Sequence, residues 1–360
     1  MGKAIVMNNI QKLQQALISQ GLDAMIATDP SNRLYATGFA SSAGTLLVTA
    51  HDAWFFTDSR YIEAARASVT GAHVHQSTSD EPVHTQIKTL LGEYGITAAG
   101  FEENSMTYSA HREWSEKLEI DLIPANKILS DLRAIKSPGD LEKMKESQRI
   151  AEKSFEEVLP LISTDMTEKQ LAAELLYRFL LNGADDKSFD TIVVSGTKSS
   201  MPHGVPEDVK IGNGFLTIDF GVRFDGWCSD TTRTLCIGKP DDEMKRIYDT
   251  VLKAQEAGIK AFRAGVVGSA VDAAARSVIE NAGYGEYFGH GFGHALGLEV
   301  HEPQSASIKS EDILPAGAVI SAEPGIYIPG HYGVRIEDVV YVTENGCENI
   351  TKLAKELIIL

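Results

Sequence analysis

Residues 215–234 read Phe215-Leu-Thr-Ile-Asp-Phe-Gly-Val-Arg-Phe-Asp-Gly-Trp-Cys-Ser-Asp-Thr-Thr-Arg-Thr234, and this segment predicts a β-hairpin. Strand-forming residues flank Asp225-Gly226, which is the strongest short signal for a two-residue hairpin turn. With those two residues as the loop, Asp219 faces Thr232 on the opposite strand. Asp230 is then a diagonal neighbour of Asp219 on the same face of the ribbon, so the two carboxylates are close enough to share an ion.

A second pair of carboxylates, Glu323 and Glu337, brackets another turn. The turn segment is Pro329-Gly-His-Tyr-Gly333, and its residue Gly330 lies midway between the two glutamates. We therefore expect Glu323 and Glu337 to face each other across a second hairpin. His331, inside the turn, is expected at the surface.

All four acids lie in apolar, strand-like contexts, and the glycine-rich segment between the two pairs contains His294. A buried carboxylate is costly unless a positive charge shares the burial. Carboxylates that converge repel by roughly 4 kcal/mol per pair at ~4 Å and an effective dielectric constant near 20. Any one of these acids alone would be read as a salt-bridged or strand-end residue. The five together predict a centre with two divalent metal ions, which would cancel the charge.

The donor types narrow the choice of metal. Oxygen-rich ligation with a single imidazole favours Mn, with Co, Zn or Fe as alternatives, and argues against a structural zinc site, which prefers thiolates. The three cysteines, Cys228, Cys236 and Cys347, lack metal-motif spacing. Their odd number also argues against a disulfide framework, so a reducing cytoplasm is the expected location.

Length and composition are those of an ordinary globular protein. A chain of 360 residues, 43% hydrophobic and 23% charged, is long enough for two domains with their own cores. The net charge of −17 argues against nucleic acid or an anionic membrane as a partner and is compatible with peptides. The apolar runs are too short to span a bilayer, and the start of the chain lacks the features of a signal peptide.

Alternating helix and strand signals predict an α/β domain in the first third of the chain. Helices are expected over 8–20, 59–68, 83–93 and 108–118, and strands over 24–27, 45–49, 53–57, 99–102 and 121–123. The aromatic run at 54–56 is expected to be strand core. Ser137, Pro138 and Asp140 then form a strong helix start, so we place the two domains at 1–133 and 134–360.

The second domain repeats a theme of two helices followed by a two-stranded ribbon. Helices are expected over 138–160, 167–183, 241–263 and 269–282, and strands over 190–195, 215–219, 226–236, 319–323 and 333–342. The aspartate pair falls in the first half and the glutamate pair in the second. We therefore predict a pseudo-twofold α+β domain with the metals on its axis, although the two halves are too dissimilar to count as a sequence repeat.

Five motifs of this domain resemble those of the Xaa-Pro peptidases, aminopeptidase P and prolidase, of the pita-bread metallopeptidase superfamily. The motifs are Ile218-Asp-Phe-Gly, Cys228-Ser-Asp-Thr-Thr-Arg-Thr, Gly289-His-Gly-Phe-Gly-His-Ala-Leu-Gly-Leu-Glu-Val-His-Glu302, Glu323-Pro-Gly-Ile-Tyr and Val334-Arg-Ile-Glu-Asp338. The first domain resembles the creatinase-like α/β domain of these enzymes through Ser31-Asn-Arg-Leu-Tyr-Ala-Thr-Gly-Phe39 and Thr57-Asp-Ser-Arg-Tyr61. The resemblance implies a pita-bread catalytic domain and a homodimer in which the first domain packs against the partner subunit.

The resemblance also implies a role for each ligand. Asp219 would bind one metal, His294 and Glu323 would complete the other, and Asp230 and Glu337 would bridge the two. A water held between the metals would be the nucleophile, because two cations lower its pKa toward neutrality. Glu323 would take the proton of that water and pass it to the leaving imide nitrogen.

Three further histidines are assigned by the same resemblance. His203 would hydrogen-bond the tetrahedral intermediate, His301 would contact the substrate carbonyl, and His290 would line the proline pocket. The glycines and prolines of residues 289–303 favour a loop that enters a short strand over a zinc-binding helix.

Arg335 and Tyr327 complete the candidate substrate-binding set with His290 and His301. Arg335 lies two residues before Glu337 on the same strand face, where it would support a bridging carboxylate or form a plain ion pair. Tyr327 would offer a hydroxyl behind the ligands or belong to the core.

Two alternatives to a metallo-aminopeptidase stay open. A non-catalytic pita-bread binding protein would be expected to have lost metal ligands, and none is lost here. A dipeptidase must recognise the carboxylate of Xaa-Pro, and some prolidases place an arginine a few residues after the His-Glu-x-Pro region. The segment Glu302-Pro-Gln-Ser-Ala-Ser-Ile308 has none. We therefore expect an Xaa-Pro aminopeptidase acting on proline-containing peptides, with Xaa-Pro dipeptidase (prolidase) as the alternative.

Overall fold

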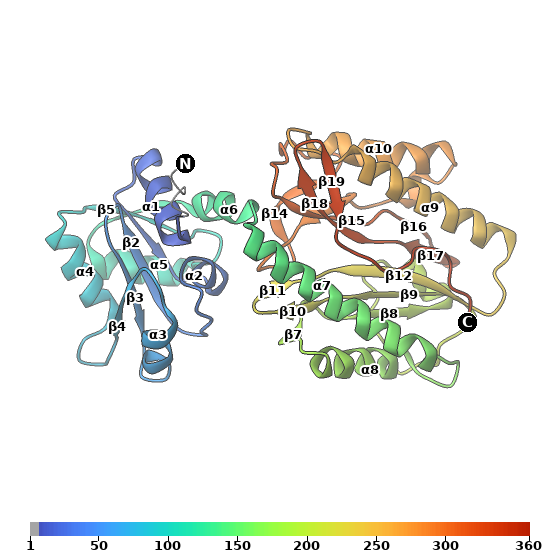
Figure 1. Cartoon of the computed structure of the whole chain (residues 1–360), viewed down its shortest axis with the longest axis horizontal. Helices are drawn as coiled ribbons and strands as arrows, with labels where there is room; N and C mark the ends of the chain where they lie inside the picture. Colours follow the sequence, from blue (N-terminus) through green and yellow to red (C-terminus); the bar gives the residue numbers. More distant parts are fainter. Residues whose placement is uncertain (1–6) are drawn as a thin grey trace, which may run out of the picture. The chain divides into compact units, whose positions relative to one another are not determined.

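The structure, a computed structural model, describes residues 7–360. It divides into two compact units, Met1–Arg133 and Ala134–Leu360, which are drawn in Figure 1. Among the helices of the described residues, none combines the length and the apolar character needed to cross a membrane.

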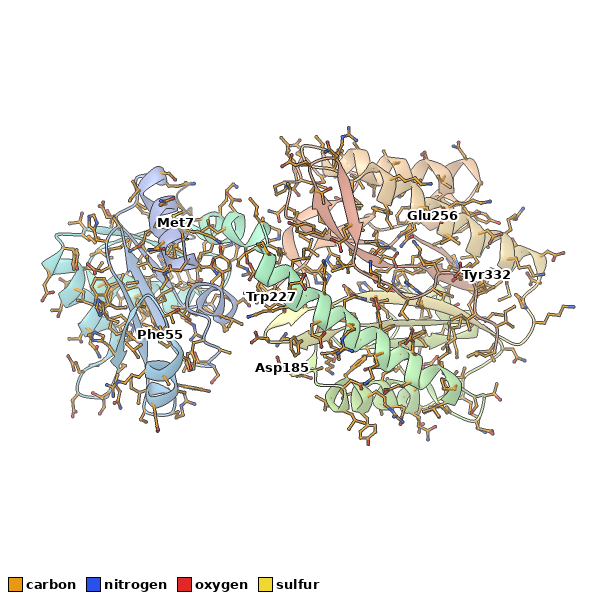
Figure 2. All side chains as sticks on the ribbon, in the orientation of Figure 1. Met7, Phe55, Asp185, Trp227, Glu256 and Tyr332 are labelled. Carbon is orange, nitrogen blue, oxygen red and sulfur yellow. The ribbon has the colours of Figure 1, made fainter. Side chains whose placement is uncertain are left out.

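The first unit is built on one mixed sheet. Its strands are β1 (Ala24–Ala27), β2 (Thr45–Thr49), β3 (Ala53–Thr57), β4 (His73–Gln76), β5 (Ala98–Phe101) and β6 (Asp121–Pro124), in the order β4-β3-β2-β1-β5-β6. Its helices are α1 (Asn9–Gln20), α2 (Pro30–Thr37), α3 (Ile62–Ser68), α4 (Val83–Glu93) and α5 (Tyr108–Leu118), and α6 (Asn126–Ala134) follows at its end. Trp54 and Phe56 of β3 pack in one cluster with Ile87 of α4 and Trp114 of α5. Phe55, labelled in Figure 2, is fully buried, so the aromatic run is strand core as predicted.

The prediction for the first unit placed the start of one helix wrongly and missed three elements. Helix α3 begins at Ile62 instead of Ser59, because the Asp58 carboxylate accepts the backbone N–H of Arg60 and holds this segment in a turn. The elements that the prediction did not include are α2, β4 and α6. Strand β4 alternates only between exposed and half-buried residues, so it lacks the apolar signal of a core strand.

The second unit has four long helices, α7 (Pro138–Val158), α8 (Glu168–Leu181), α9 (Asp242–Ala261) and α10 (Gly268–Asn281), and three short 3₁₀ turns, η1 (Leu159–Leu161), η2 (Gly196–Ser200) and η3 (Gly285–Tyr287). Its first group of strands is β7 (Asp186–Lys187), β8 (Ile192–Ser195), β9 (Gly214–Phe220), β10 (Val222–Phe224), β11 (Trp227–Cys228) and β12 (Thr231–Ile237). The second group is β13 (Gly293–Ala295), β14 (Glu302–Ala306), β15 (Val319–Ala322), β16 (Gly325–Ile328), β17 (Tyr332–Arg335), β18 (Asp338–Thr343) and β19 (Gly346–Asn349). The strands pair in the orders β11-β10-β7, β12-β9-β8, β14-β13-β15-β18-β19 and β16-β17.

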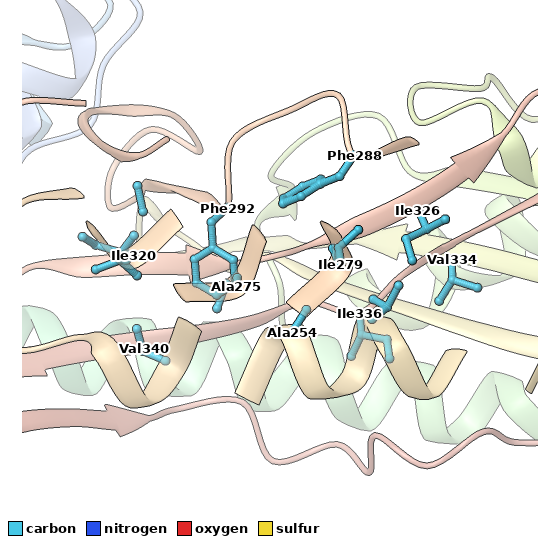
Figure 3. Close-up of a cluster of buried hydrophobic side chains, with 14 of the residues drawn as sticks. Ala254, Ala275, Ile279, Phe288, Phe292, Ile320, Ile326, Val334, Ile336 and Val340 are labelled. Carbon is cyan, nitrogen blue, oxygen red and sulfur yellow. The ribbon is translucent and has the colours of Figure 1, made fainter. Parts of the chain in front are cut away.

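The helices of the second unit form two pairs, one for each group of strands. Helices α7 and α8 share a core with the first group, in which Phe155 and Phe220 stack 5.1 Å apart. Helices α9 and α10 share another core with the second group, shown in Figure 3. In Figure 1 the two helix pairs lie on opposite sides of the strands. The predicted pseudo-twofold α+β fold is confirmed.

Local sequence signals account for the starts of the first helix pair. Ser137 and Asp140 form a reciprocal capping box, with Pro138 at the first helical position of α7. Thr167 and Gln170 form the same motif at the start of α8. In both helices the capping side chain accepts a backbone N–H that the helix itself leaves unpaired.

The first hairpin has the predicted register. Asp225 and Gly226 both have positive φ values, 48° and 82°, as a type I′ turn requires. Asp219 pairs with Thr232 between β9 and β12. Asp219 is thus carried on β9, and Asp230 directly precedes the paired strand β12.

The second hairpin also has the predicted register. Gly325 pairs with Arg335 between β16 and β17, which brings Glu323 and Glu337 to opposite positions just beyond the paired residues. Gly330 lies in the turn with φ 76°, and His331 is exposed as predicted.

Three predicted strands are interrupted or end next to a predicted ligand. The strand predicted over 226–236 is broken between β11 and β12, and the strand over 333–342 is broken between β17 and β18. The strand over 319–323 ends before Glu323. At the breaks the backbone bonds to other strands or loops: the Glu337 N–H donates to Thr232 O at 3.1 Å, and the Glu323 N–H donates to Phe292 O at 2.8 Å. The breaks therefore join the two hairpins where the predicted ligands lie.

Candidate metal centre and active site

The five predicted metal ligands line a single cavity of about 420 Å³. Asp219 comes from β9 and His294 from β13, while the other three lie at the strand breaks: Asp230 between β11 and β12, Glu323 between β15 and β16, and Glu337 between β17 and β18. A residue between two strands is free of the regular pleat. Its side chain can therefore turn toward a common point.

Three of the ligands form a compact cluster. One donor atom each from Asp230, His294 and Glu337 lies within 4.8 Å of the others. His294 Nε2 lies 3.7 Å from Asp230 Oδ2 and 3.3 Å from Glu323 Oε1. Asp230 and Glu337 are 5% and 1% exposed, so water cannot compensate their charge.

Crowding of acids changes their proton affinities. Burial and the neighbouring carboxylates Glu337, Asp219 and Glu323 raise the pKa of Asp230 well above its ordinary value. Burial raises the pKa of Glu337 in the same way, with Glu323 and Asp219 as further causes. The ionised form of both carboxyl groups is therefore destabilised in the folded protein. A bound cation would stabilise that ionised form.

Two buried carboxylate oxygens indicate that the cavity suits a metal ion. Asp219 Oδ1 and Glu337 Oε1 are inaccessible to solvent and have no hydrogen-bond partner among the described residues. Buried acceptors are nearly always satisfied, so two orphaned ones in one acidic cavity call for a ligand. Carboxylate oxygens with one imidazole suit a divalent cation, and the donor set therefore fits metal binding.

Arg335 is buried in the wall of the cavity. Its Nη2 donates to Asp219 Oδ2 at 2.6 Å and its Nε donates to Thr232 Oγ1 at 3.0 Å. Of the two roles predicted for it, support of a bridging carboxylate or a plain ion pair, the contact with Asp219 is an ion pair. The side chain turns to Asp219 because the Arg335 backbone lies over the first hairpin, where Thr234 Oγ1 exchanges hydrogen bonds with it.

Tyr327 lies behind the cavity and is not one of its lining residues. Arg335 Nη1 donates to its hydroxyl at 2.9 Å, and the hydroxyl lies 2.9 Å from His290 Nε2. Burial raises the pKa of Tyr327 to about 12 and lowers the pKa of His290. A protonated phenol facing a neutral imidazole donates to Nε2, which leaves the His290 Nδ1–H to donate to Gly291 O at 2.8 Å. The contacts thus fix the orientation of His290.

His203 and His301 are the exposed histidines of the cavity. His203 follows Pro202, whose carbonyl accepts a 3.2 Å hydrogen bond from Arg335 Nη1. The His301 ring centre lies 4.2 Å from that of His294, and burial and His294 together lower the pKa of His301. Both are more exposed than His290 and His294, which line the same cavity.

Two hydroxyls that the sequence prediction did not assign hold the ligands in place. Thr232 Oγ1 donates to Glu337 Oε2 at 2.7 Å, and Ser321 Oγ donates to Glu323 Oε1 at 3.1 Å while accepting the His294 N–H at 3.0 Å. The hairpin registers already placed Thr232 opposite Asp219. Strand alternation would have placed Ser321 on the same face as Glu323, so both were within reach of sequence reasoning.

The site also has a fully buried ion pair that sequence reasoning could not have predicted. Lys136 Nζ lies 2.8 Å from Glu302 Oε2, with both side chains at most 1% exposed. Glu302 Oε1 also accepts the Leu298 N–H at 3.1 Å, so the pair holds the loop that leads to His301. Lys136 lies far from this loop in the sequence, and no local pattern links them.

Comparison with known proteins fits this geometry. The pattern described as Metallopeptidase family M24 matches residues 142–344, which carry every candidate ligand. The chain belongs to metallopeptidase family M24. The pattern described as Creatinase/Prolidase N-terminal domain matches residues 9–135, so this M24 metallopeptidase carries a creatinase/prolidase-type domain ahead of the M24 segment.

Relatives of this M24 metallopeptidase align over nearly its full length. An uncharacterized peptidase of Bacillus subtilis is 41% identical, with 98% of this chain and 99% of the relative covered. An Xaa-Pro dipeptidase of Pyrococcus horikoshii is 33% identical, with 98% and 99% covered.

Solved structures extend the comparison. An Xaa-Pro dipeptidase from Bacillus anthracis superposes with a TM-score of 0.94 at 40% identity, covering 98% of this chain and 99% of that one. An X-Pro aminopeptidase from Thermotoga maritima superposes with a TM-score of 0.90 at 34% identity, covering 96% and 100%. The two-unit architecture is therefore shared with proteins described by either name.

Proposed function

We propose that this M24 metallopeptidase hydrolyses the bond between an N-terminal residue Xaa and a following proline, with two divalent metal ions bound by Asp219, Asp230, His294, Glu323 and Glu337. The observation that carries the proposal is the pair of orphaned oxygens, Asp219 Oδ1 and Glu337 Oε1, in a buried cluster of acids. When bound, the cations would supply Lewis acidity and a water of lowered pKa. Mn is the favoured metal, with Co, Zn or Fe as alternatives.

The remaining chemistry falls to side chains around the cluster. Glu323, held by Ser321 beside His294, takes a proton from the attacking water and returns it to the proline nitrogen, which must be protonated to leave. His203 and His301 donate to the carbonyl oxygen as negative charge develops on it. A donor of this kind is worth about 2.7 to 4 kcal/mol in the transition state.

The cavity wall has surfaces for the two residues that flank the scissile bond. His290 lines the cavity, is fixed by its contacts with Tyr327 and Gly291, and would contact the proline. Phe189, Ile192 and Val300 are the large apolar side chains of the lining. They give contact area to the pyrrolidine ring and to the Xaa side chain.

The charge of the cavity favours an aminopeptidase over a dipeptidase. Among the described residues that line it, Arg335 is the only arginine or lysine, and its guanidinium is already committed to Asp219, Tyr327 and Thr232. A dipeptidase needs a cation for the carboxylate of its substrate. A peptide that continues past proline needs none.

A dipeptidase is the second candidate. It is favoured by the relatives described as Xaa-Pro dipeptidases, among them the structure at 40% identity. In that case the missing cation would come from elsewhere, for example from a partner subunit.

Hydrolysis of Ala-Pro and Ala-Pro-Gly-Gly by the Mn-loaded protein separates the candidates. We expect kcat/KM for alanine release from the tetrapeptide to exceed that from the dipeptide at least tenfold. Hydrolysis of Ala-Pro alone would show a dipeptidase. Asp230→Asn should abolish turnover, whereas Asp225→Asn in the exposed hairpin turn should not. A metal-loaded protein that cleaves neither peptide would be a non-catalytic binding protein.

We propose further that the protein acts as a homodimer in the cytoplasm. The dimer is suggested by the creatinase-type first domain, and the cysteines Cys228, Cys236 and Cys347, all free, suit a reducing compartment. Sedimentation equilibrium should give twice the chain mass of 39.1 kDa. A species with the mass of one chain at micromolar concentration would contradict the dimer.

A further inference from the structure

A second cavity, of about 460 Å³, opens next to the metal centre. It is lined by one side of α8, by the start of β8 and by residues 203–206, and it shares His203 and Ile192 with the metal cavity. The two cavities therefore meet at the histidine that we place on the substrate carbonyl. None of the five metal ligands lines the second cavity, so a group held there would bind without reacting.

The walls of this cavity are apolar. The apolar lining consists of Ala172, Ala173, Leu176, Ile192, Val205 and Pro206. Val205 is 72% exposed, which is unusual for valine and leaves apolar surface available to a ligand. Among the described residues of the lining, the Lys and Asp side chains are Lys187 and Asp190, which pair with each other at 2.5 Å, with Asp190 almost fully exposed to solvent. The cavity therefore offers mainly apolar walls, with this ion pair, Thr191 and His203 as its polar groups.

The position of this cavity indicates which part of a substrate it would hold. In an aminopeptidase nothing precedes Xaa, so the peptide extends only beyond proline. The metal cavity, at about 420 Å³, lies within the range of sites for single small ligands and has its own apolar walls for Xaa and proline. Resting on the proposed aminopeptidase function, we propose that the second cavity is the subsite for the residue that follows proline and that it takes an apolar side chain.

Substitutions in α8 test the subsite. Leu176→Trp would fill the cavity, and Leu181→Trp, on the same helix, 61% exposed and outside the lining, is the matched control. Wild-type kcat/KM should be at least roughly tenfold higher for Ala-Pro-Leu than for Ala-Pro-Gly, which is the scale expected for burying a leucine side chain. Leu176→Trp should bring this ratio close to one and leave Ala-Pro-Gly within twofold. Leu181→Trp should leave the ratio unchanged.

A second variant allows the subsite to be tested even if Leu176→Trp does not fold. Val205→Asp places a charge at the exposed rim and should lower the Leu-to-Gly ratio by at least threefold. The proposal is overturned if the ratio is near one in the wild type, or if Leu176→Trp and Val205→Asp leave it unchanged. It is also overturned if the substitutions change the ratio of Leu-Pro-Gly to Ala-Pro-Gly instead, because the cavity would then hold Xaa. Absence of hydrolysis of every Xaa-Pro peptide would refute the proposed function itself.

Discussion

Arg335 joins three parts of the site at the scale of single residues. It bonds a metal-ligand candidate, Asp219, a hydroxyl that supports another ligand, Thr232, and the phenol that orients His290. A guanidinium can do this because it presents several donors in one rigid plane, whereas an ammonium is a point charge.

We predict that Arg335→Lys lowers metal affinity and kcat/KM by about 10- to 100-fold each, because groups that support metal ligands have effects of this size. Metal affinity can be measured by titration calorimetry and activity with Ala-Pro-Gly-Gly. Arg263→Lys, at an exposed position, is the control and should change neither. If Arg335→Lys binds metal as the wild type does, the arginine is a structural ion pair only.

Turns and strand breaks decide the geometry at the scale of elements. The hairpins align the ligands in pairs, and the breaks release Asp230, Glu323 and Glu337 from the pleat. The first hairpin depends on Gly226, which has φ 82°.

We predict that Gly226→Ala destabilises the protein by about 1–2 kcal/mol, since a side chain in the left-handed region carries a cost of that order. A unit of this size should then melt a few degrees lower, which differential scanning calorimetry would detect. Gly346→Ala is the matched control: Gly346 also lies at a β-turn, has no positive φ, and has open space where its side chain would be. Equal melting temperatures for the two variants would contradict the turn argument.

The Lys136–Glu302 pair connects two elements, the start of α7 and strand β14. Both side chains are withdrawn from water, so removal of Lys136 takes a charged hydrogen-bond donor away from a buried carboxylate.

We predict that Lys136→Met destabilises the protein by about 3–5 kcal/mol, because it removes one partner of a buried ion pair. Denaturant unfolding of the variant and of the wild type measures this. The control is Lys143→Met, because Lys143 lies on α7 and forms an exposed ion pair with Asp225 of the hairpin turn. This substitution should lower the free energy of unfolding by no more than about 1 kcal/mol. A loss for Lys136→Met as small as that of the control would show that the buried pair contributes little.

At the scale of the whole molecule, the charge of the acidic cluster affects stability. The cluster lies between the two helix-and-strand halves of the second unit. In the metal-free protein the carboxyl groups of Asp230, Glu337 and Glu323 have raised pKa values, mainly through burial. The folded state then retains protons that the unfolded chain releases. Stability of the metal-free protein therefore falls as pH rises from the ordinary carboxyl pKa, about 4, through the raised values.

A metal ion must displace those protons, so we predict that Mn²⁺ raises the melting temperature more at pH 8 than at pH 5. At a free concentration of 100 times its dissociation constant, an ion adds about 2.7 kcal/mol to the free energy of unfolding. Thermal melts with Mn²⁺ and with EDTA at both pH values test this, and Asp230→Asn should reduce the difference. An equal shift at both pH values would mean that the cluster does not take up protons.

Sequence alone was sufficient where a capping box or a glycine-containing hairpin turn gave the signal. Capping boxes located the starts of α7 and α8, the Asp225-Gly226 turn set the register of Asp219, and the turn around Gly330 set that of Glu323 and Glu337. A turn or a cap depends on the dihedral preferences of a few adjacent residues, so their order along the chain determines it.

Only the tertiary structure decided what depends on distant segments. It broke two predicted strands at Asp230 and Glu337 and ended a third before Glu323, turned Arg335 toward Asp219, buried Lys136 against Glu302, and placed a second cavity beside His203. Each of these depends on packing and charge burial between residues far apart in the chain, which no local preference encodes. The sequence therefore determined the candidate ligands and the hairpins that carry them, and the packing of the two halves determined how those groups are held and what they can reach.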